Sequence, residues 1–196
     1  MEVRYPGKRV WEEPLKEKAP AFAIADNLFF VGNRNVSCHL LKTEKGLVLL
    51  DSAWEQTVDM LVESIKSVGH DPAQIKMIIH THAHIDHCGG TKRMREISGA
   101  VTAIGMEDAE VVEKGTDKII KITEFAVFNV DKDLRHLDVI DMGDVKITCH
   151  HTPGHTKGTL TFTFNVNVDG QTLTAGMFGG PGFNTLPGGI HEMFGY

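Results

Sequence analysis

The chain has 196 residues, a length typical of one domain. Its 20 basic and 26 acidic residues give a net charge of −6, so it lacks the basic field that nucleic-acid binding requires. A hydrophobic content of 41% with 23% charged residues excludes a disordered chain. No apolar run approaches the ~18 residues of a membrane-spanning helix. We therefore expect neither nucleic acid nor a membrane as a partner.

Residues 1–20 are polar and contain Pro6, Pro14 and Pro20. Prolines and charges favour an extended arm across the surface, so we expect one domain at residues 21–196 preceded by this arm. The arm carries no apolar segment of the kind found in secretory signals. The chain as written therefore reads as cytoplasmic, and as periplasmic or secreted if a leader was removed.

Three cysteines, Cys38, Cys88 and Cys149, are spread widely along the chain. An odd and scattered set argues against a disulfide framework and predicts reduced thiols. The place of Cys88 next to a histidine allows a thiolate ligand, but we expect both Cys88 and Cys149 to pack in the interior.

Short apolar runs separated by turn residues predict a meander of three strands at 27–31, 38–41 and 47–51. Apolar residues at spacings of three and four then predict a helix over 57–68 that ends at Gly69. Further along, the pattern predicts strands at 76–80, 100–104, 125–130, 138–140, 145–150, 159–168 and 171–175, helices at 91–97 and 107–114, and a solvated turn at 131–133. Two sheets with helices packed outside them account for this order of elements.

Histidine is the outlier of the composition, since seven of the 11 histidines fall at positions 80–87 and 150–155. The first cluster reads THAHIDH and follows the strand predicted at 76–80, where sites are often built. His82 and His84 are two apart in extended backbone, so both imidazoles can bind one ion, while Asp86 and His87 can reach a second. Imidazole with carboxylate suits zinc. His80 lies inside the apolar run and is expected to be buried.

The second cluster reads HHTPGH and follows another predicted strand. Pro153 and Gly154 predict a tight turn that presents His155 at the strand end. A third imidazole there would complete a three-histidine site. We expect His150 and His151 to be structural, with His151 bracing the turn.

The motifs HTHAHIDH and HTPGHT, at this separation, resemble those of the metallo-β-lactamase superfamily, and the resemblance extends from about Trp11 onward. It implies an α/β fold, the αββα metallo-β-lactamase sandwich, with one or two zinc ions between the sheets. It also implies the metal ligands, which are His82, His84 and His155 for the first zinc and Asp86 and His87 for the second. Asp51 matches an acidic residue that usually supports the site without binding metal.

Many thioesterases and lactonases of this superfamily have an aspartate that bridges both ions, at a position where this sequence has Met177. A thioether cannot bridge two zinc ions as a carboxylate does. The third subclass of class B β-lactamases manages without that carboxylate and usually has serine there, followed by a Pro-Gly-Tyr-like step. The stretch Pro181-Gly182-Phe183 resembles that step, so the resemblance is nearest to this subclass.

In that subclass the last ligand of the second zinc is a histidine on a later strand, and the sequence ends at Tyr196 before such a segment. His191 is the one histidine beyond His155, and it follows two glycines in a predicted loop. We therefore expect a sandwich that lacks its C-terminal segment, with a strand edge open to self-association.

Zinc in such a site lowers the pKa of its water toward ~7 and supplies hydroxide, which would open a lactam amide. Asp86, close to water and metal, is the expected catalytic residue that orients the nucleophile and passes a proton. The expected substrate is a small molecule with a cyclic amide or ester. The glycine-rich stretch 176–189, Trp54 and Phe183 are candidate substrate contacts, although packing suits Trp54 equally well.

Three hypotheses remain open. A zinc-dependent β-lactamase, which would confer antibiotic resistance, agrees with both histidine motifs. A hydrolase of esters, lactones or thioesters agrees with the lack of a visible secretory signal, because a cytoplasmic enzyme would not meet periplasmic drugs. A metal-binding protein without catalysis agrees with Met177 and with the missing sixth ligand.

Overall fold

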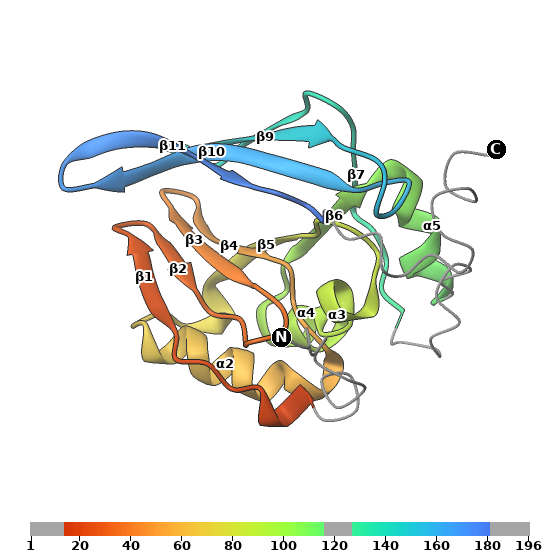
Figure 1. The fold of residues 1–196 in the computed structure, drawn as a ribbon, viewed down its shortest axis with the longest axis horizontal. Coiled ribbons are helices and arrows are strands. Elements are labelled where there is room, and N and C mark those ends of the chain that lie inside the picture. The colour runs from red at the N-terminus through yellow and green to blue at the C-terminus, as the bar shows by residue number, and fades with distance from the viewer. Residues whose placement is uncertain (1–13, 116–126, 181–196) are drawn as a thin grey trace, which may run out of the picture.

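The computed structural model describes residues 14–115 and 127–180. Within them, the larger of two sheets has seven strands in the order β1-β2-β3-β4-β5-β6-β7 (Figure 1). These strands are β1 (Phe22–Ala25), β2 (Leu28–Phe30), β3 (His39–Thr43), β4 (Gly46–Leu50), β5 (Ile75–Ile79), β6 (Val101–Gly105) and β7 (Lys132–Leu134). Strands β1 to β4 pair antiparallel, whereas β4 to β7 pair parallel. The predicted meander is confirmed and gains β1 as a further strand.

The smaller sheet is antiparallel, with the order β11-β10-β9-β8 in the described residues. Its strands are β8 (Val139–Asp141), β9 (Lys146–His151), β10 (Leu160–Val168) and β11 (Gln171–Met177). Alternate residues of β10, among them Phe162 and Phe164, are buried, as the alternation in the sequence predicts. Strand β11 lies at one end of this sheet and pairs with β10 among the described residues. Self-association through its outer edge stays a prediction.

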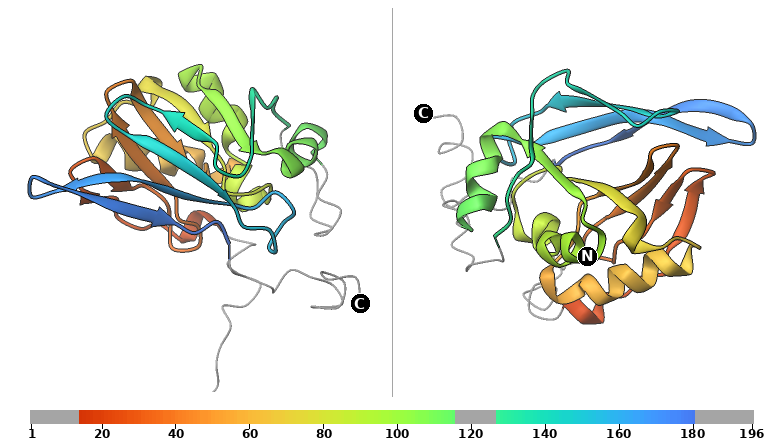
Figure 2. Two further views of the ribbon diagram at one scale, coloured as in Figure 1. Left: turned by 90° about the horizontal axis from the view of Figure 1, so that it is seen from above. Right: turned by 180° about the vertical axis from the view of Figure 1, so that it is seen from behind.

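The two sheets are stacked, and α2 (Val58–Ser67) and α4 (Thr91–Ser98) lie against the outer face of the larger one (Figures 1 and 2). Between the sheets, side chains such as Leu50 and Ile79 pack with Ile147 and Phe162 in one core. Burial of each such side chain contributes about 1.5–3 kcal/mol to folding. This arrangement of helices and two stacked sheets confirms the predicted α/β sandwich.

The helices begin and end close to their predicted positions. In α2, Val58, Leu61 and Ile65 form the buried stripe, and Gly69 follows with a φ of +85°. α5 (Met106–Lys114) ends at Gly115, which has a φ of +64°. Both glycines adopt the left-handed backbone conformation that commonly ends a helix. Four shorter helices complete the set in the described residues, namely η1 (Pro14–Lys16), η2 (Glu55–Thr57), η3 (Pro72–Gln74) and α3 (Ile85–Cys88).

One edge of the larger sheet receives the described segments that carry the predicted metal ligands. Because β4, β5 and β6 are parallel, their carboxyl ends lie side by side; Asp51 follows the first of them and the loop of His82 the second. The turn between β9 and β10 comes to the same edge, since the backbone N–H of Leu160 donates to the carbonyl oxygen of Thr81 at 2.8 Å. Ligands of α/β proteins usually bind outside the carboxyl ends of strands.

The strand predicted at 125–130 is wrong for residues 127–130, which pair with no strand of the described residues. Phe128 there is buried, with its ring 5.4 Å from that of His80. The structure has a strand a few residues later, β7, where the sequence predicted a solvated turn at 131–133. Its two charged residues are exposed and Leu134 is buried, so backbone pairing with β6, rather than an apolar pattern, creates it. Residues 125 and 126 lie outside the described part.

The predicted N-terminal arm contacts the domain where it is described. Pro14 begins the 3-10 turn η1 (Pro14–Lys16) and is buried, which the predicted surface arm does not anticipate. Lys18 forms an ion pair with Glu63 of α2 at 3.0 Å. Residues 1–13 lie outside the described part, and the boundary at residue 20 stays a prediction.

None of the helices in residues 14–115 and 127–180 has both the length and the apolar character needed to span a bilayer.

Candidate metal centre

Three predicted ligands converge at the carboxyl edge of the larger sheet. His82 and His84 come from the loop between β5 and α3, and His155 comes from the turn between β9 and β10. One ring nitrogen from each lies within 4.8 Å of those of the other two. The three ring centroids are 4.5 to 4.7 Å apart. The structure therefore brings together two clusters that are about seventy residues apart in the sequence.

The spacing of these imidazoles suits zinc. Nδ1 of His84 lies 2.9 Å from Nε2 of His155. A tetrahedral zinc with Zn–N bonds of about 2.0–2.1 Å sets its ligand nitrogens about 3.3 Å apart. The His84–His155 separation is shorter than this value, so a small rotation of the two rings would accommodate the ion.

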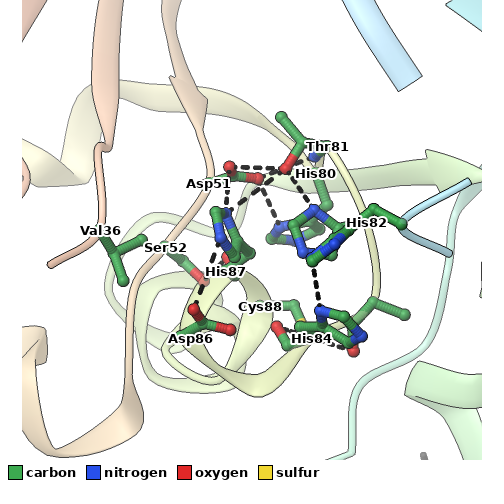
Figure 3. Close-up of polar contacts among 12 residues, drawn as sticks. Val36, Asp51, Ser52, His80, Thr81, His82, His84, Asp86, His87 and Cys88 are labelled. Carbon is green, nitrogen blue, oxygen red and sulfur yellow. Dashed lines mark hydrogen bonds and ion pairs between the residues drawn. The ribbon is translucent and has the colours of Figure 1, made fainter. Parts of the chain in front are cut away.

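Hydrogen bonds fix the tautomer of His82 (Figure 3). The Thr81 hydroxyl donates to Oδ2 of Asp51 at 2.8 Å, so its oxygen is left to accept a proton from Nδ1 of His82, 3.0 Å away. We infer from this network that Nε2 carries the lone pair. That buried nitrogen has no hydrogen-bond partner among the described residues. A metal cation would satisfy it, which is the arrangement expected of a metal-binding histidine.

Asp51 is fully buried and also supports the loop of the predicted second site. Its carboxylate accepts the backbone N–H of Thr81 at 2.8 Å and contacts Nδ1 of His87 at 2.8 Å. The φ of Asp51 is +61°, a left-handed conformation that is strained for a residue with a side chain. The structure thus places Asp51 behind the histidines, as the resemblance implies.

Asp86 and His87 lie beside the three-histidine cluster. Both belong to α3, and Oδ2 of Asp86 is 3.6 Å from Nε2 of His87. The ring of His87 is 4.1 Å from that of His82, between centroids. Among the described residues, the cluster with ligand atoms within 4.8 Å contains neither residue, so their role as ligands of a second zinc stays a prediction.

Burial and neighbouring histidines lower the pKa of two members of the cluster, His82 and His84. Burial, followed by repulsion from His155 and His87, lowers the pKa of His84 to about 3. Burial and the neighbouring histidines lower the pKa of His82 well below its usual value. Neutral imidazoles offer lone pairs to a cation without first releasing a proton.

The pKa values of Asp86 and His87 are raised instead. Burial raises the pKa of Asp86 more than the charge of His87 lowers it. Burial alone would lower the pKa of His87, but the charge of Asp51 and its hydrogen bond outweigh burial, so the pKa of His87 is raised. Perturbed titratable groups gathered in a cleft are a common property of active sites.

A cleft of about 690 Å³ opens above the histidines, within the range of small-molecule sites. Its floor is made of the histidines with Asp51 and Asp86. Its walls come from both sheets. They include the apolar residues Ile24, Leu28, Phe164, Met177 and Phe178 and the polar residues Asn35, Ser37 and His39. Ile24 and Phe178 are 46% and 63% exposed, so apolar surface is available to a ligand at the mouth of the cleft.

Several other predicted residues are placed by the structure. Trp54 is buried in the core under α2, which decides for packing and against substrate contact. Met177 lines the cleft at the end of β11, together with Gly176, Gly179 and Gly180 of the glycine-rich stretch. Residues 181–189 of that stretch, including Pro181, Gly182 and Phe183, and also His191, lie outside the described residues.

His80, His150, His151 and the cysteines have structural surroundings. His80 is fully buried and bonds to the Thr91 hydroxyl at 2.9 Å. His151 contacts the carbonyl oxygen of Lys157 at 2.7 Å across the turn, and His150 contacts the Thr163 hydroxyl at 2.8 Å. All three cysteines are buried and none forms a disulfide.

Sequence reasoning missed Thr81, Asp108 and two polar residues that line the cleft, Ser37 and His39. Thr81 belongs to the THAHIDH motif and directly precedes the predicted ligand His82, so its position could have indicated a supporting role. Asp108 is buried and bonds to both histidine loops. Ser37 and His39 carried no signal, because their place in the wall depends on how the two sheets stack.

Comparisons with known proteins agree with this geometry. A family model described as the metallo-beta-lactamase superfamily matches residues 31–168. The solved structure of BJP-1, a subclass B3 metallo-beta-lactamase of Bradyrhizobium japonicum, superposes with a TM-score of 0.80 and is 31% identical, covering 86% of this chain and 66% of that one.

Two curated relatives are similar in sequence. An N-acyl homoserine lactonase of a Bacillus species is 25% identical over 70% of this chain and 61% of its own. A cytoplasmic hydroxyacylglutathione hydrolase of Arabidopsis thaliana is 32% identical over 52% of this chain and 33% of its own. The chain thus spans less than two thirds of the length of either relative. Because the family model covers both histidine loops and most of both sheets, the chain belongs to the metallo-β-lactamase superfamily.

Proposed function

We propose that this chain is a zinc-dependent hydrolase, with His82, His84 and His155 as the ligands of a zinc ion. The observation that carries the proposal is the buried Nε2 of His82, which faces two further imidazoles without a partner among the described residues. Zinc accepts three histidines and leaves a fourth position open in catalytic sites.

Zinc in such a site supplies Lewis acidity and a water whose pKa is lowered toward about 7. The chain's own residues bind and orient the reactants. Asp51 holds Thr81 and His87 in place. Asp86 has a raised pKa and stands at the floor of the cleft, so its carboxylate is suited to orient a nucleophilic water and accept its proton. Asp86 and His87 are the proposed ligands of a second zinc.

A β-lactam is the substrate that we propose first. The fold similarity to a subclass B3 metallo-beta-lactamase supports it. Met177 supports it too, because a thioether in the cleft cannot serve as the carboxylate bridge that the resemblance assigns to many lactonases and thioesterases. Apolar side chains that line the cleft, Phe178 among them, would receive the substituents of such a ring, which is a small molecule with a cyclic amide.

A hydrolase of lactones, esters or thioesters is the second candidate. The relatives that are a lactonase and a hydroxyacylglutathione hydrolase favour it. The same three imidazoles and the same cleft would serve both reactions, since each begins with attack on a carbonyl carbon.

Hydrolysis by the zinc-loaded chain separates these candidates. The purified chain is incubated with zinc and with penicillins, cephalosporins and carbapenems, and in parallel with homoserine lactones and a glutathione thioester. Turnover of lactams supports the first candidate, and turnover confined to lactones or thioesters selects the second. A chain that binds zinc and hydrolyses none of these compounds is a non-catalytic metal-binding protein, which would end both candidates.

His84→Ala tests the ligand set on which either candidate depends. Loss of one of three imidazoles is expected to weaken zinc binding by more than 100-fold, beyond the 10–100-fold cost of losing a supporting residue, and to abolish hydrolysis. Zinc affinity by chelator competition and initial rates on the best substrate measure this. The exposed His136 serves as the matched control, since His136→Ala should change neither quantity. Equal zinc affinity in both variants would contradict the ligand assignment.

A further inference from the structure

Asp108 is a buried carboxylate next to the metal centre that the proposed reaction does not use. It lies in the first turn of α5, which follows β6 at the same edge of the sheet as the histidine loops. Only 2% of the residue is exposed. A carboxylate is almost never buried to this degree without several hydrogen-bond donors around it.

The donors to Asp108 come from both histidine loops. The backbone N–H of Ala83 donates to Oδ2 at 3.0 Å, and Ala83 is the residue between His82 and His84. The Thr156 hydroxyl donates to the same oxygen at 2.6 Å, and Thr156 directly follows His155. The backbone N–H of Gly158, in the same turn, donates to Oδ1 at 2.9 Å. One carboxylate thus connects the loop after β5 with the turn between β9 and β10.

Two glycines allow this close approach. A Cβ on Gly158 would lie 2.7 Å from Cγ of Asp108, and a Cβ on Gly105 would lie 2.1 Å from the carbonyl oxygen of Gly158. Side chains at these positions would push the turn away from α5. The absence of side chains therefore lets the turn that bears His155 pack directly on the carboxylate.

We propose that Asp108 is a positioning residue that sets the distance between the two histidine loops and thereby the affinity of the three-histidine site for metal. Asp51 orients side chains of the first loop, whereas Asp108 connects the backbone of that loop with the turn of His155. The inference rests on the proposed zinc site for its link to metal affinity, and on hydrogen bonds alone for the connection between the loops.

A graded series of substitutions tests the proposal by zinc affinity, measured by chelator competition. Asp108→Ala removes all three acceptor contacts and is expected to raise the Kd for zinc 10–100-fold. Asp108→Asn keeps one acceptor oxygen and should give an intermediate effect. Thr156→Val removes one donor at nearly constant shape and should raise the Kd a few-fold.

Asp131→Asn is the matched control for loss of stability alone. Asp131 accepts three hydrogen bonds, from the backbone and hydroxyl of Thr102 and from Arg95, and contacts neither histidine loop in these bonds. We expect Asp131→Asn to lower the melting temperature and to leave the Kd for zinc within two-fold. If Asp108→Asn and Thr156→Val bind zinc as tightly as this control, the proposal is overturned, and these two milder variants decide it even if Asp108→Ala does not fold.

Amide hydrogen exchange of the metal-free protein separates this proposal from the proposed function. Loosening of the connection should speed exchange at Ala83 and Gly158 in Asp108→Asn by ten-fold or more, and leave exchange in the strands β9 and β10 unchanged. Unchanged exchange at both amides would overturn the role of Asp108 whatever the zinc affinity. An unsubstituted chain that binds no zinc would overturn the zinc site, and exchange would still decide whether Asp108 connects the loops.

Discussion

At the scale of single residues, hydrogen bonds among Asp51, Thr81 and His82 fix the orientation of the candidate metal ligand His82. Thr81 is 1% exposed and stands between Asp51 and the ring of His82. The Thr81 hydroxyl has one proton, and the carboxylate of Asp51 can only accept a hydrogen bond. Thr81 therefore donates to Asp51 and accepts from Nδ1 of His82. We infer from this that Nε2 of His82 carries the lone pair, which is the form that would bind a metal ion.

Thr81→Val tests this relay. The substitution keeps the shape of the side chain and leaves Nδ1 of His82 without its acceptor, which we expect to cost about 1–3 kcal/mol of stability and 10–100-fold in zinc affinity. Urea denaturation and chelator competition measure the two effects. Thr57 provides the control, because its buried hydroxyl donates to the carbonyl oxygen of Trp54 at 3.0 Å, outside the site. Thr57→Val should lower stability without weakening zinc binding, and equal zinc affinities in the two variants would contradict the relay.

At the scale of elements, short polar connections decide where strands begin. Asp131 directly precedes β7 and accepts the backbone N–H of Thr102 in β6 at 2.9 Å. It also accepts a hydrogen bond from Nη2 of Arg95, in α4, at 2.8 Å. Partial burial alone would raise the pKa of Asp131, but the hydrogen bonds from Thr102 and the guanidinium of Arg95 outweigh it, so the pKa is lowered. A charged residue therefore joins α4, β6 and the start of β7.

The pH dependence of Asp131→Asn follows from that lowered pKa. A carboxyl whose pKa is lower in the folded state stabilises the protein above its unfolded pKa of about 3.9, and this contribution is lost as the pH falls through the folded pKa. Because Asp131 is partly exposed, we expect a cost of roughly 1 kcal/mol at pH 7. Urea denaturation of both proteins at pH 7 and near pH 3 should show the difference shrinking at the lower pH. A difference that stays constant between the two would contradict an ionised Asp131.

At the scale of the whole molecule, the three-histidine cluster brings together loops from both sheets. His82 and His84 lie in the loop that follows β5 of the larger sheet, and His155 lies in the turn between β9 and β10 of the smaller one. A cation bound by all three would connect the sheets at one end of the sandwich. Such a cation binds the folded chain and not the unfolded one, so it stabilises the fold by mass action.

Zinc should therefore raise the melting temperature of the whole chain. At a free zinc concentration of 100 times Kd the expected stabilisation is about 2.7 kcal/mol, and EDTA should reverse it. Differential scanning calorimetry of the unsubstituted chain, His155→Ala and His136→Ala measures the effect. The increase should persist in His136→Ala and disappear in His155→Ala. An equal increase in both variants would place the bound zinc somewhere other than between the sheets.

Local patterns explain why much of the architecture was predictable. The stripe of Val58, Leu61 and Ile65 and the glycine after it define α2 by themselves, and the alternation in β10 defines a strand with one buried face. The strand β7 was not predictable, because its backbone pairs with β6 while only Leu134 is buried. Phe128 led to the wrong prediction of a strand for the opposite reason. It is an apolar residue that packs on His80 in the core, although its backbone belongs to neither sheet.

The sequence by itself predicted the metal ligands, because two histidine clusters with ligand-type spacing are too specific to arise from packing. It also determined the family, through the order of motifs along the chain. Only the tertiary structure decided that His155 meets His82 and His84, that Trp54 is core and that Asp108 connects the two histidine loops. The physical reason is that these contacts join segments from different strands, helices and sheets, and no local pattern in a sequence records the distance between segments that meet only when the sheets stack.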